Sequence, residues 1–384
     1  MKFATTYLNV NPKHPVKQAG FIQQVNPISE VHDDLMARVI YLEDQEIVIM
    51  ISIDNLGLPL EFQLKVQERL QQRFDKKVNL TISSTHTHFA GDPRDVEYQN
   101  QILEEIEKGV AALQIKEYQA LTYSFTYEYF DRVGKSRISK QESDSIYLEV
   151  VSIYGDGTRL ANLMIYNCHP TILSGLTPYF SAEYPGYSIG KLRGLYPGEF
   201  FTFMQGADGD ISTRFTRSGQ EYDSVEELGN IFVEEVQKLL QKELPQKEVK
   251  LSYTGEYLPL IHEILDLETL EIPTDITDRE KETIEFGKVS REKLLKDMDK
   301  LPKSILISKV DFGDYKMIFA PNELFSYYIK ALEKDHASLV CYSNGYRPYV
   351  TGIGKQRITY ELFTDTYSKE TKEQLFALLK KYSQ

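Results

Sequence analysis

The run Ile47–Ile53 (IVIMISI) constrains the fold more than any other part of the sequence. It is apolar and rich in β-branched residues, and seven residues are too few to span a bilayer, so it predicts a buried strand. Residues 36–42 (MARVIYL) precede it across the polar tetrapeptide EDQE and predict its paired neighbour. With 384 residues, 41% of them hydrophobic, the chain can bury the sizeable core that such strands require.

Strand-like and helix-like segments alternate along the rest of the chain. Such interleaving is typical of the α/β class or of a mixed α+β fold. Predicted strands are 36–42, 47–53, 78–84, 121–130, 146–154, 160–167, 200–204, 305–310, 315–319 and 338–342. Predicted helices are 59–74, 98–113, 223–244, 324–335 and 368–382.

The domain organisation follows from what the sequence lacks. No segment has the composition of a linker and no repeat period stands out, so we expect one compact unit over residues 1–384, built as one body or as two lobes. Residues 263–303 are charge-dense and helical in pattern after Pro273. They predict a solvated helical insertion, with a lid as the alternative interpretation.

Charge and cysteine content restrict the partners and the compartment. The net charge of −13 disfavours nucleic acid and docking on anionic lipid through a basic patch. Two cysteines are too few for a disulfide framework and favour a reducing compartment. The N-terminal residues contain no apolar signal segment and no run is long enough for a transmembrane span, so we expect a cytoplasmic protein.

Three of the seven histidines lie in small-residue loops after predicted strands: His86, His88 and His169. In an extended His-x-His segment both rings face the same side, which suits two metal ligands, or one ligand and one proton-transfer group. A hydrogen-bonded structural pair is the alternative. Cys168, beside His169, would point the other way in a strand, so we interpret it as a core residue.

Three further loops carry polar residues that are ambiguous when taken alone. Ser212 ends the glycine-rich segment QGADGDIS, and a serine there can be a nucleophile, an oxyanion or metal-water partner, or a turn cap. Glu323 follows a predicted strand and is either a metal ligand or an acidic residue in a first helical turn. Tyr346 and Tyr349 lie in the rigid loop NGYRPYVTG.

Taken together and in order, these clusters resemble the neutral/alkaline ceramidase family over roughly residues 1–365. The matching motifs are Thr85-His86-Thr87-His88, His169-Pro170-Thr171, Tyr184-Pro185-Gly186-Tyr187, Gln205-Gly206 with Gly209-Asp210-Ile211-Ser212, Pro321-Asn322-Glu323-Leu324 and Asn344-Gly345-Tyr346-Arg347-Pro348-Tyr349-Val350-Thr351. The resemblance implies mixed β-sheets flanked by helices and a zinc-dependent amide hydrolase with one Zn²⁺ per chain. It covers the family's catalytic domain and not its C-terminal β-domain.

The resemblance also implies a role for eight residues. The implied zinc ligands are His86, His169, Glu323 and Tyr349. The implied catalytic and substrate-contacting residues are His88, Ser212, Arg137 in VGKSRIS, and Tyr360. Imidazole and anionic oxygen ligands suit zinc, and they also suit iron, manganese or nickel. As partners of the ligand histidines we propose Asp54 and Asp210.

The sequence departs from the family around the expected substrate mouth. Phe89-Ala90-Gly91 follows the histidine pair where Ser-Gly-Pro is usual, and Thr213-Arg214 replaces Pro-Asn. We therefore expect a small-molecule or lipid N-acyl amide as substrate, without assigning ceramide.

Three alternatives stay open on sequence alone. A TIM-barrel amidohydrolase also begins with His-x-His after a strand, although the chain lacks eight clean βα units. A non-catalytic relative could bind a ligand or partner protein. A metal-free serine hydrolase would use Ser212 and His88, although the nucleophile elbow is absent.

Overall fold

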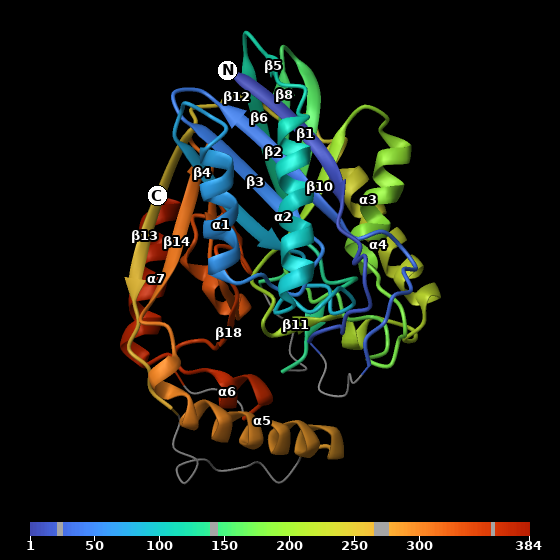
Figure 1. Cartoon of the computed structure of the whole chain (residues 1–384), viewed down its shortest axis with the longest axis vertical. Helices are drawn as coiled ribbons and strands as arrows, with labels where there is room; N and C mark the ends of the chain where they lie inside the picture. Colours follow the sequence, from blue (N-terminus) through green and yellow to red (C-terminus); the bar gives the residue numbers. More distant parts are fainter. Residues whose placement is uncertain (21–25, 139–144, 265–275, 355–357) are drawn as a thin grey trace.

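The computed structural model describes residues 1–20, 26–138, 145–264, 276–354 and 358–384 (Figure 1). Two five-stranded sheets form its centre. The first has the strand order β4-β3-β2-β1-β5, and the second has the order β10-β9-β8-β6-β12. Their bounds are β1 Lys2–Asn9, β2 Met36–Glu43, β3 Ile47–Ile53, β4 Val78–Ser84, β5 Lys116–Glu117, β6 Leu121–Tyr129, β8 Tyr147–Gly155, β9 Thr158–Tyr166, β10 Phe200–Gln205 and β12 Lys247–Glu248.

The predicted buried strand is β3, and both of its faces are covered. Successive side chains of a strand point to opposite faces. Ile49 and Ile51 belong to a core shared with helices α1 (Leu60–Gln71) and α2 (Val96–Ala111). Val48 and Met50 belong instead to a core shared with the second sheet. Figure 1 shows α1 and α2 lying across the outer face of the first sheet.

The second sheet has the same construction on the opposite side. Its outer face packs against α3 (Glu183–Leu195) and α4 (Tyr222–Leu240) in one apolar cluster. That cluster includes Phe203 of β10 and Phe232 of α4, whose ring centroids lie 5.9 Å apart. The centre of the molecule is therefore four layers, helices–sheet–sheet–helices, and the predicted mixed α+β class is confirmed.

A third sheet lies beside the two central ones, in the order β13-β14-β15-β17. One of its faces shares a core with α7. A two-stranded parallel ladder, β16-β18, and a short pair, β11-β7, complete the strands of the described residues. Their bounds are β7 Lys135–Ser136, β11 Ile211–Ser212, β13 Ser252–Pro259, β14 Ser304–Asp311, β15 Lys316–Phe319, β16 Asn322–Leu324, β17 Ala337–Val340, β18 Arg347–Val350 and α7 Lys369–Ser383.

The predicted helix over 324–335 is wrong. Residues 322–324 form β16, and a 3₁₀-helix, Ser326–Ala331, follows. β16 pairs with β18, and the amide of Phe325 donates to the carbonyl of Val350. These tertiary hydrogen bonds hold Leu324 and Phe325 extended at the start of the predicted helix, a case in which tertiary context overrides local propensity.

The charged segment predicted as a helical insertion contains helix α5, Asp278–Lys296, while its residues 265–275 lie outside the described part. A capping box begins α5: Thr277 accepts from the amide of Glu280, whose carboxylate accepts from the amide of Thr277. Figure 1 shows α5 at the bottom of the molecule against α6 (Tyr360–Thr364).

The architecture excludes one of the three alternatives. Open, largely antiparallel sheets replace the eight-stranded parallel barrel that a TIM-barrel amidohydrolase requires. Within the described ranges, no helix is long and apolar enough to cross a membrane. Cys168 and Cys341 are both buried free thiols, and Cys168 lies in the core as predicted.

Candidate metal centre

The candidate site lies where strands of the two central sheets end. His86 and His88 follow β4, and His169 follows β9. Because β3 and β4 are parallel and β9 and β10 are parallel, their carboxyl ends lie at matching sheet edges. The three imidazoles meet there, with one ring nitrogen from each lying within 4.8 Å of the others.

The backbone at His86 is not extended. Its φ of 65° lies in the left-handed region, which is unfavourable for a residue with a side chain. The turn brings Nδ1 of His86 to 2.6 Å from the carbonyl of Leu56 and stacks the ring on Tyr342 at 4.0 Å between centroids. Nδ1 therefore carries a hydrogen, and Nε2 is left as a lone-pair donor facing the other histidines. A tight turn, and not strand alternation, brings His86 and His88 together.

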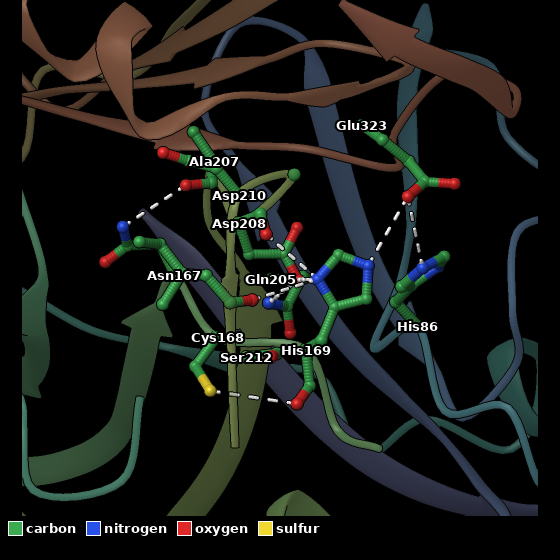
Figure 2. A network of polar contacts seen from close by, with 12 residues as sticks. His86, Asn167, Cys168, His169, Gln205, Ala207, Asp208, Asp210, Ser212 and Glu323 are labelled. Atoms are coloured by element: carbon green, nitrogen blue, oxygen red, sulfur yellow. Dashed lines mark hydrogen bonds and ion pairs between the residues drawn. The ribbon is translucent and has the colours of Figure 1, made fainter. Parts of the chain in front are cut away.

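Three acceptors surround Nδ1 of His169 and keep this nitrogen protonated. Its Nδ1 lies 3.0 Å from Oδ2 of Asp208, 2.9 Å from the carbonyl of Asp208 and 3.1 Å from that of Ile211 (Figure 2). Asp208 is fully buried and also accepts hydrogen bonds from Gln205, at 2.6 Å, and from the hydroxyl of Tyr342. A carboxylate behind a histidine is the arrangement that orients metal-binding imidazoles.

Glu323 faces both ligand histidines from β16. Its Oε2 lies 3.6 Å from Nε2 of His86 and 3.4 Å from Nε2 of His169 (Figure 2). Its Oε1 accepts a hydrogen bond from the hydroxyl of Tyr346. Oε2 of Glu323 and Nε2 of His169 are buried and make no hydrogen bond within the described residues. Two buried polar atoms of this kind need a partner, and a cation between them supplies one.

The distances fit a tetrahedral cation. With metal–ligand bonds of about 2.0–2.1 Å, two ligand atoms of a tetrahedron lie about 3.4 Å apart. The pairs His86–Glu323 and His169–Glu323 lie 3.6 and 3.4 Å apart. The buried group His86, His88 and His169 can therefore bind a metal, with Glu323 in reach of the same point.

The electrostatics of the cluster are dominated by burial and by two carboxylates. Burial and the neighbouring imidazoles hold the pKa of His88 well below its ordinary value, so it is neutral. Burial lowers the pKa of His169 as well, but the Asp208 carboxylate outweighs it and the pKa is about 9. Burial raises the pKa of Glu323, but His86 and His169 reverse this and hold it below its usual range. A cation at Nε2 of His169 would replace the proton held there.

Arg137 and the tyrosines lie next to this cluster. Nη2 of Arg137 donates to the hydroxyl of Tyr349 at 3.1 Å, and the Tyr349 ring lies 6.5 Å from that of His169. Tyr360 packs edge-on against Tyr349 at 6.3 Å between centroids. Burial and Glu323 raise the pKa of Tyr349 well above its ordinary value, and Arg137 acts in the opposite direction.

Ser212 lies beside His169 through the backbone, because residues 169 and 212 form a parallel β-bridge. Its Oγ accepts from the amide of Arg214 at 3.4 Å, which is the capping role that was one of its alternatives. The structure thus brings the eight predicted residues into one neighbourhood and leaves their roles as predictions.

The prediction that Asp54 and Asp210 orient the ligand histidines is wrong. Asp54 accepts hydrogen bonds from both Nη atoms of Arg38 and from the hydroxyl of Thr85. It therefore fixes the residue before His86, and these contacts do not involve the imidazole ring. Asp210 accepts from the amide and hydroxyl of Ser326 at 2.6 and 2.9 Å. The residue in contact with the imidazole is Asp208, in the same glycine-rich loop.

Sequence reasoning missed three residues of the site. Asp208 had a usable signal, since QGADGDIS contains two aspartates two residues apart and either one can face the preceding strand end. Tyr342, which stacks on His86, gave no signal among the 26 tyrosines. Neither did Glu361, which lies 3.1 Å from Nη2 of Arg137.

Comparisons with known proteins bear on the fold. No protein-family model matches the chain, and no curated protein matches its sequence. Solved structures that match the whole chain include a ceramidase complexed with C2, with a TM-score of 0.75, and neutral ceramidase from Pseudomonas aeruginosa, with a TM-score of 0.74. The chain has the ceramidase fold. In both cases 74% of the neighbour is covered and 15% of residues are identical.

The expected resemblance to neutral ceramidases is therefore confirmed for the fold. The chain spans about three quarters of the length of each neighbour. At 15% identity the likeness carries no residue roles, so these rest on the geometry above.

Proposed function

We propose that the protein is a zinc-dependent hydrolase that cleaves an amide (N-acyl) bond. The observation that carries the proposal is the buried set of His86, His169 and Glu323, whose facing atoms have tetrahedral spacing and include two atoms without hydrogen bonds. The ceramidase fold supports the reaction class. We assign Tyr349 as the fourth ligand and one Zn²⁺ per chain.

Zinc bound there would lower the pKa of a water toward about 7 and polarise a carbonyl group. The protein supplies the remaining chemistry. His88 is neutral, and its Nε2 lies 3.4 Å from that of His86, so it can accept a proton beside the metal and pass it to the departing amine. Arg137, with Tyr360 and Ser212, would stabilise charge on the acyl oxygen.

The substrate class is a small-molecule or lipid N-acyl amide. One solved neighbour is a ceramidase complexed with C2, which supports a lipid amide. The residues after the histidine pair and after Ser212 differ from the family pattern, so the acyl chain and head group need not be those of ceramide. A cytoplasmic location remains our proposal for the compartment.

The test is hydrolysis of a panel of N-acyl amides, with N-acetyl, N-octanoyl and N-dodecanoyl forms of sphingosine and of simple amines. Released carboxylic acid is measured by mass spectrometry in zinc-loaded protein, after chelation, and after zinc is restored. We expect activity that is lost on chelation and regained with zinc. His88→Asn should retain zinc and lose turnover, while the exposed His336→Asn serves as its control.

Two results would contradict the proposal in different ways. Hydrolysis that survives chelation would replace the metal mechanism with the serine mechanism of Ser212. A zinc-loaded protein that cleaves no member of the panel would favour the non-catalytic, ligand-binding alternative.

A further inference from the structure

The contacts of Arg137 leave one edge of its guanidinium open. Its Nη2 reaches three acceptors: the carbonyl of Gly209 at 2.7 Å, the hydroxyl of Tyr349 at 3.1 Å and Oε1 of Glu361 at 3.1 Å. Its Nε is buried and has no hydrogen-bond partner within the described residues. A guanidinium is planar with its N–H donors in a fixed fork, so fixing Nη2 also fixes the direction of the remaining donors.

Glu361 is the one acidic group among those three acceptors. It lies in the first turn of α6 and is 7% exposed. The Arg137 side chain is 20% exposed, so the pair is better shielded from water than a surface ion pair and interacts more strongly. Truncating a shielded carboxylate would leave the arginine charge without its partner.

Helix α6 is itself fixed to the strand that carries Tyr349. Asp365, directly after α6, accepts hydrogen bonds from the amide and hydroxyl of Thr351 at 2.8 and 2.7 Å. It also lies 2.6 Å from Nζ of Lys372 in α7. These bonds set the distance between Glu361 and the end of β18, where Tyr349 lies.

Helix α5 packs against the outer side of α6 (Figure 1). Ile284 and Phe363 are buried in one small apolar cluster between them. A Cβ atom at Gly287 would lie 2.5 Å from the ring of Phe363, so glycine permits this close approach. Glycine inside a helix costs about 1 kcal/mol relative to alanine, which the close packing offsets. The hydroxyls of Ser290 and Tyr360 lie 3.5 Å apart across the same contact.

We propose that Glu361 is a positioning residue that aims the open Nε edge of Arg137 at the acyl oxygen, and that α5 holds α6 in place for this purpose. The inference rests on the proposed amide hydrolysis and adds a residue and a helix to it. On this account the charged insertion acts on the reaction through α6, without contributing a ligand or a proton.

The experiment compares Glu361→Gln, Glu361→Asp, Arg137→Met and the Arg137→Met/Glu361→Gln double variant. The control is Glu97→Gln, a charge change on a side chain that is 79% exposed. For the N-acyl amide that wild type cleaves best, we measure kcat and KM separately. Zinc content is measured on each protein.

We expect Glu361→Gln to lower kcat by about 10–100-fold, the cost of a misplaced catalytic group, with KM and zinc content little changed. Glu361→Asp should recover part of kcat, and the double variant should be no slower than Arg137→Met alone. An unchanged kcat in Glu361→Gln, or losses that multiply in the double variant, would overturn the proposal.

A binding measurement separates this proposal from the proposed function. Dodecanoate, whose carboxylate resembles the acid product, is titrated by calorimetry into wild type and each variant. A positioning role predicts weaker binding in both Glu361→Gln and Arg137→Met. A purely electrostatic role predicts tighter binding of dodecanoate in Glu361→Gln, because a nearby negative charge is removed. Tighter binding would overturn the proposal even if the protein cleaves no amide. Wild-type binding no tighter than that of Arg137→Met would overturn it as well.

Discussion

Replacing Asp208 by asparagine tests how the site holds its metal. The carboxylate of Asp208 is fully buried, with Oδ2 facing Nδ1 of His169 and Nε2 of Gln205, and Oδ1 facing the hydroxyl of Tyr342. An asparagine can keep its oxygen toward His169 and Gln205 and donate its amide to the Tyr342 oxygen. The substitution therefore removes the negative charge behind the imidazole, keeps the bonds to His169 and Gln205, and reverses the direction of the bond to Tyr342.

The expected effect is a loss of zinc affinity. Removing such a carboxylate costs about 10–100-fold in metal affinity, or roughly 1.4–2.8 kcal/mol. The assay is competition for zinc against a chromogenic chelator, with near-ultraviolet circular dichroism to confirm that tertiary packing is retained. Catalytic rate is measured only after the protein has been saturated with zinc, so that the effect on catalysis is separated from the effect on zinc affinity.

The matched control is Asp210→Asn, a change of the same kind two residues away in the same loop. Asp210 bonds to Ser326 and not to an imidazole, so its replacement should leave zinc affinity close to that of wild type. If Asp208→Asn binds zinc as tightly as wild type, or if Asp210→Asn loses as much affinity as Asp208→Asn, the assignment of Asp208 as the orienting carboxylate is refuted.

Four further substitutions have defined outcomes in urea unfolding. Burial raises the pKa of Glu183 from its ordinary 4.5 to about 8, so the folded protein keeps a proton that the unfolded chain loses, and wild-type stability falls as pH rises through this window. The stability of Glu183→Gln relative to wild type should therefore be higher at pH about 8 than at pH about 5, by roughly 2–5 kcal/mol. The same relative stability at both pH values would contradict this. Gly287→Ala should destabilise the protein by about 1–3 kcal/mol, because the added Cβ clashes with the ring of Phe363. Gly190→Ala, where a Cβ meets nothing within 4 Å, should stabilise it by about 0.5–1 kcal/mol. Stability changes of the same sign at both positions would refute the packing argument. Tyr346→Phe leaves Oε1 of Glu323 without its donor and should cost about 1–3 kcal/mol, and unchanged stability would show that the hydrogen bond contributes nothing.

The elements that sequence pattern predicts well are those whose pattern and burial agree. β3 is buried on both faces as its apolar run indicates, and α7 extends over Lys369–Ser383 as its spacing indicates. The helix predicted after Glu323 fails at its start because the backbone of Leu324 and Phe325 pairs with β18, a strand that is distant in sequence, and only a 3₁₀-helix follows. Periodicity reports the local preference of a segment and contains no information on such a partner.

Some residues of the candidate site could likewise be predicted from sequence, and others could not. Loops after strand ends could be identified from sequence, because small and polar residues follow apolar runs there, and His86, His88 and His169 from such loops meet in one group. The choice between Asp208 and Asp210 depended on the turn between β10 and β11, in which each residue faces a different neighbour. Glu361 approaches Arg137 from a helix more than two hundred residues along the chain, a contact set by tertiary packing alone.

The measurement that tests the central claim most directly is the metal content of purified protein by elemental analysis. Wild type, His86→Ala and Glu323→Ala are compared after incubation with zinc and removal of the excess, with the exposed His336→Ala as control. We predict about one zinc per chain in wild type and in His336→Ala, and a loss of zinc in the other two variants. Wild-type protein that stays metal-free after zinc is supplied, or variants that retain wild-type zinc content, would contradict the account.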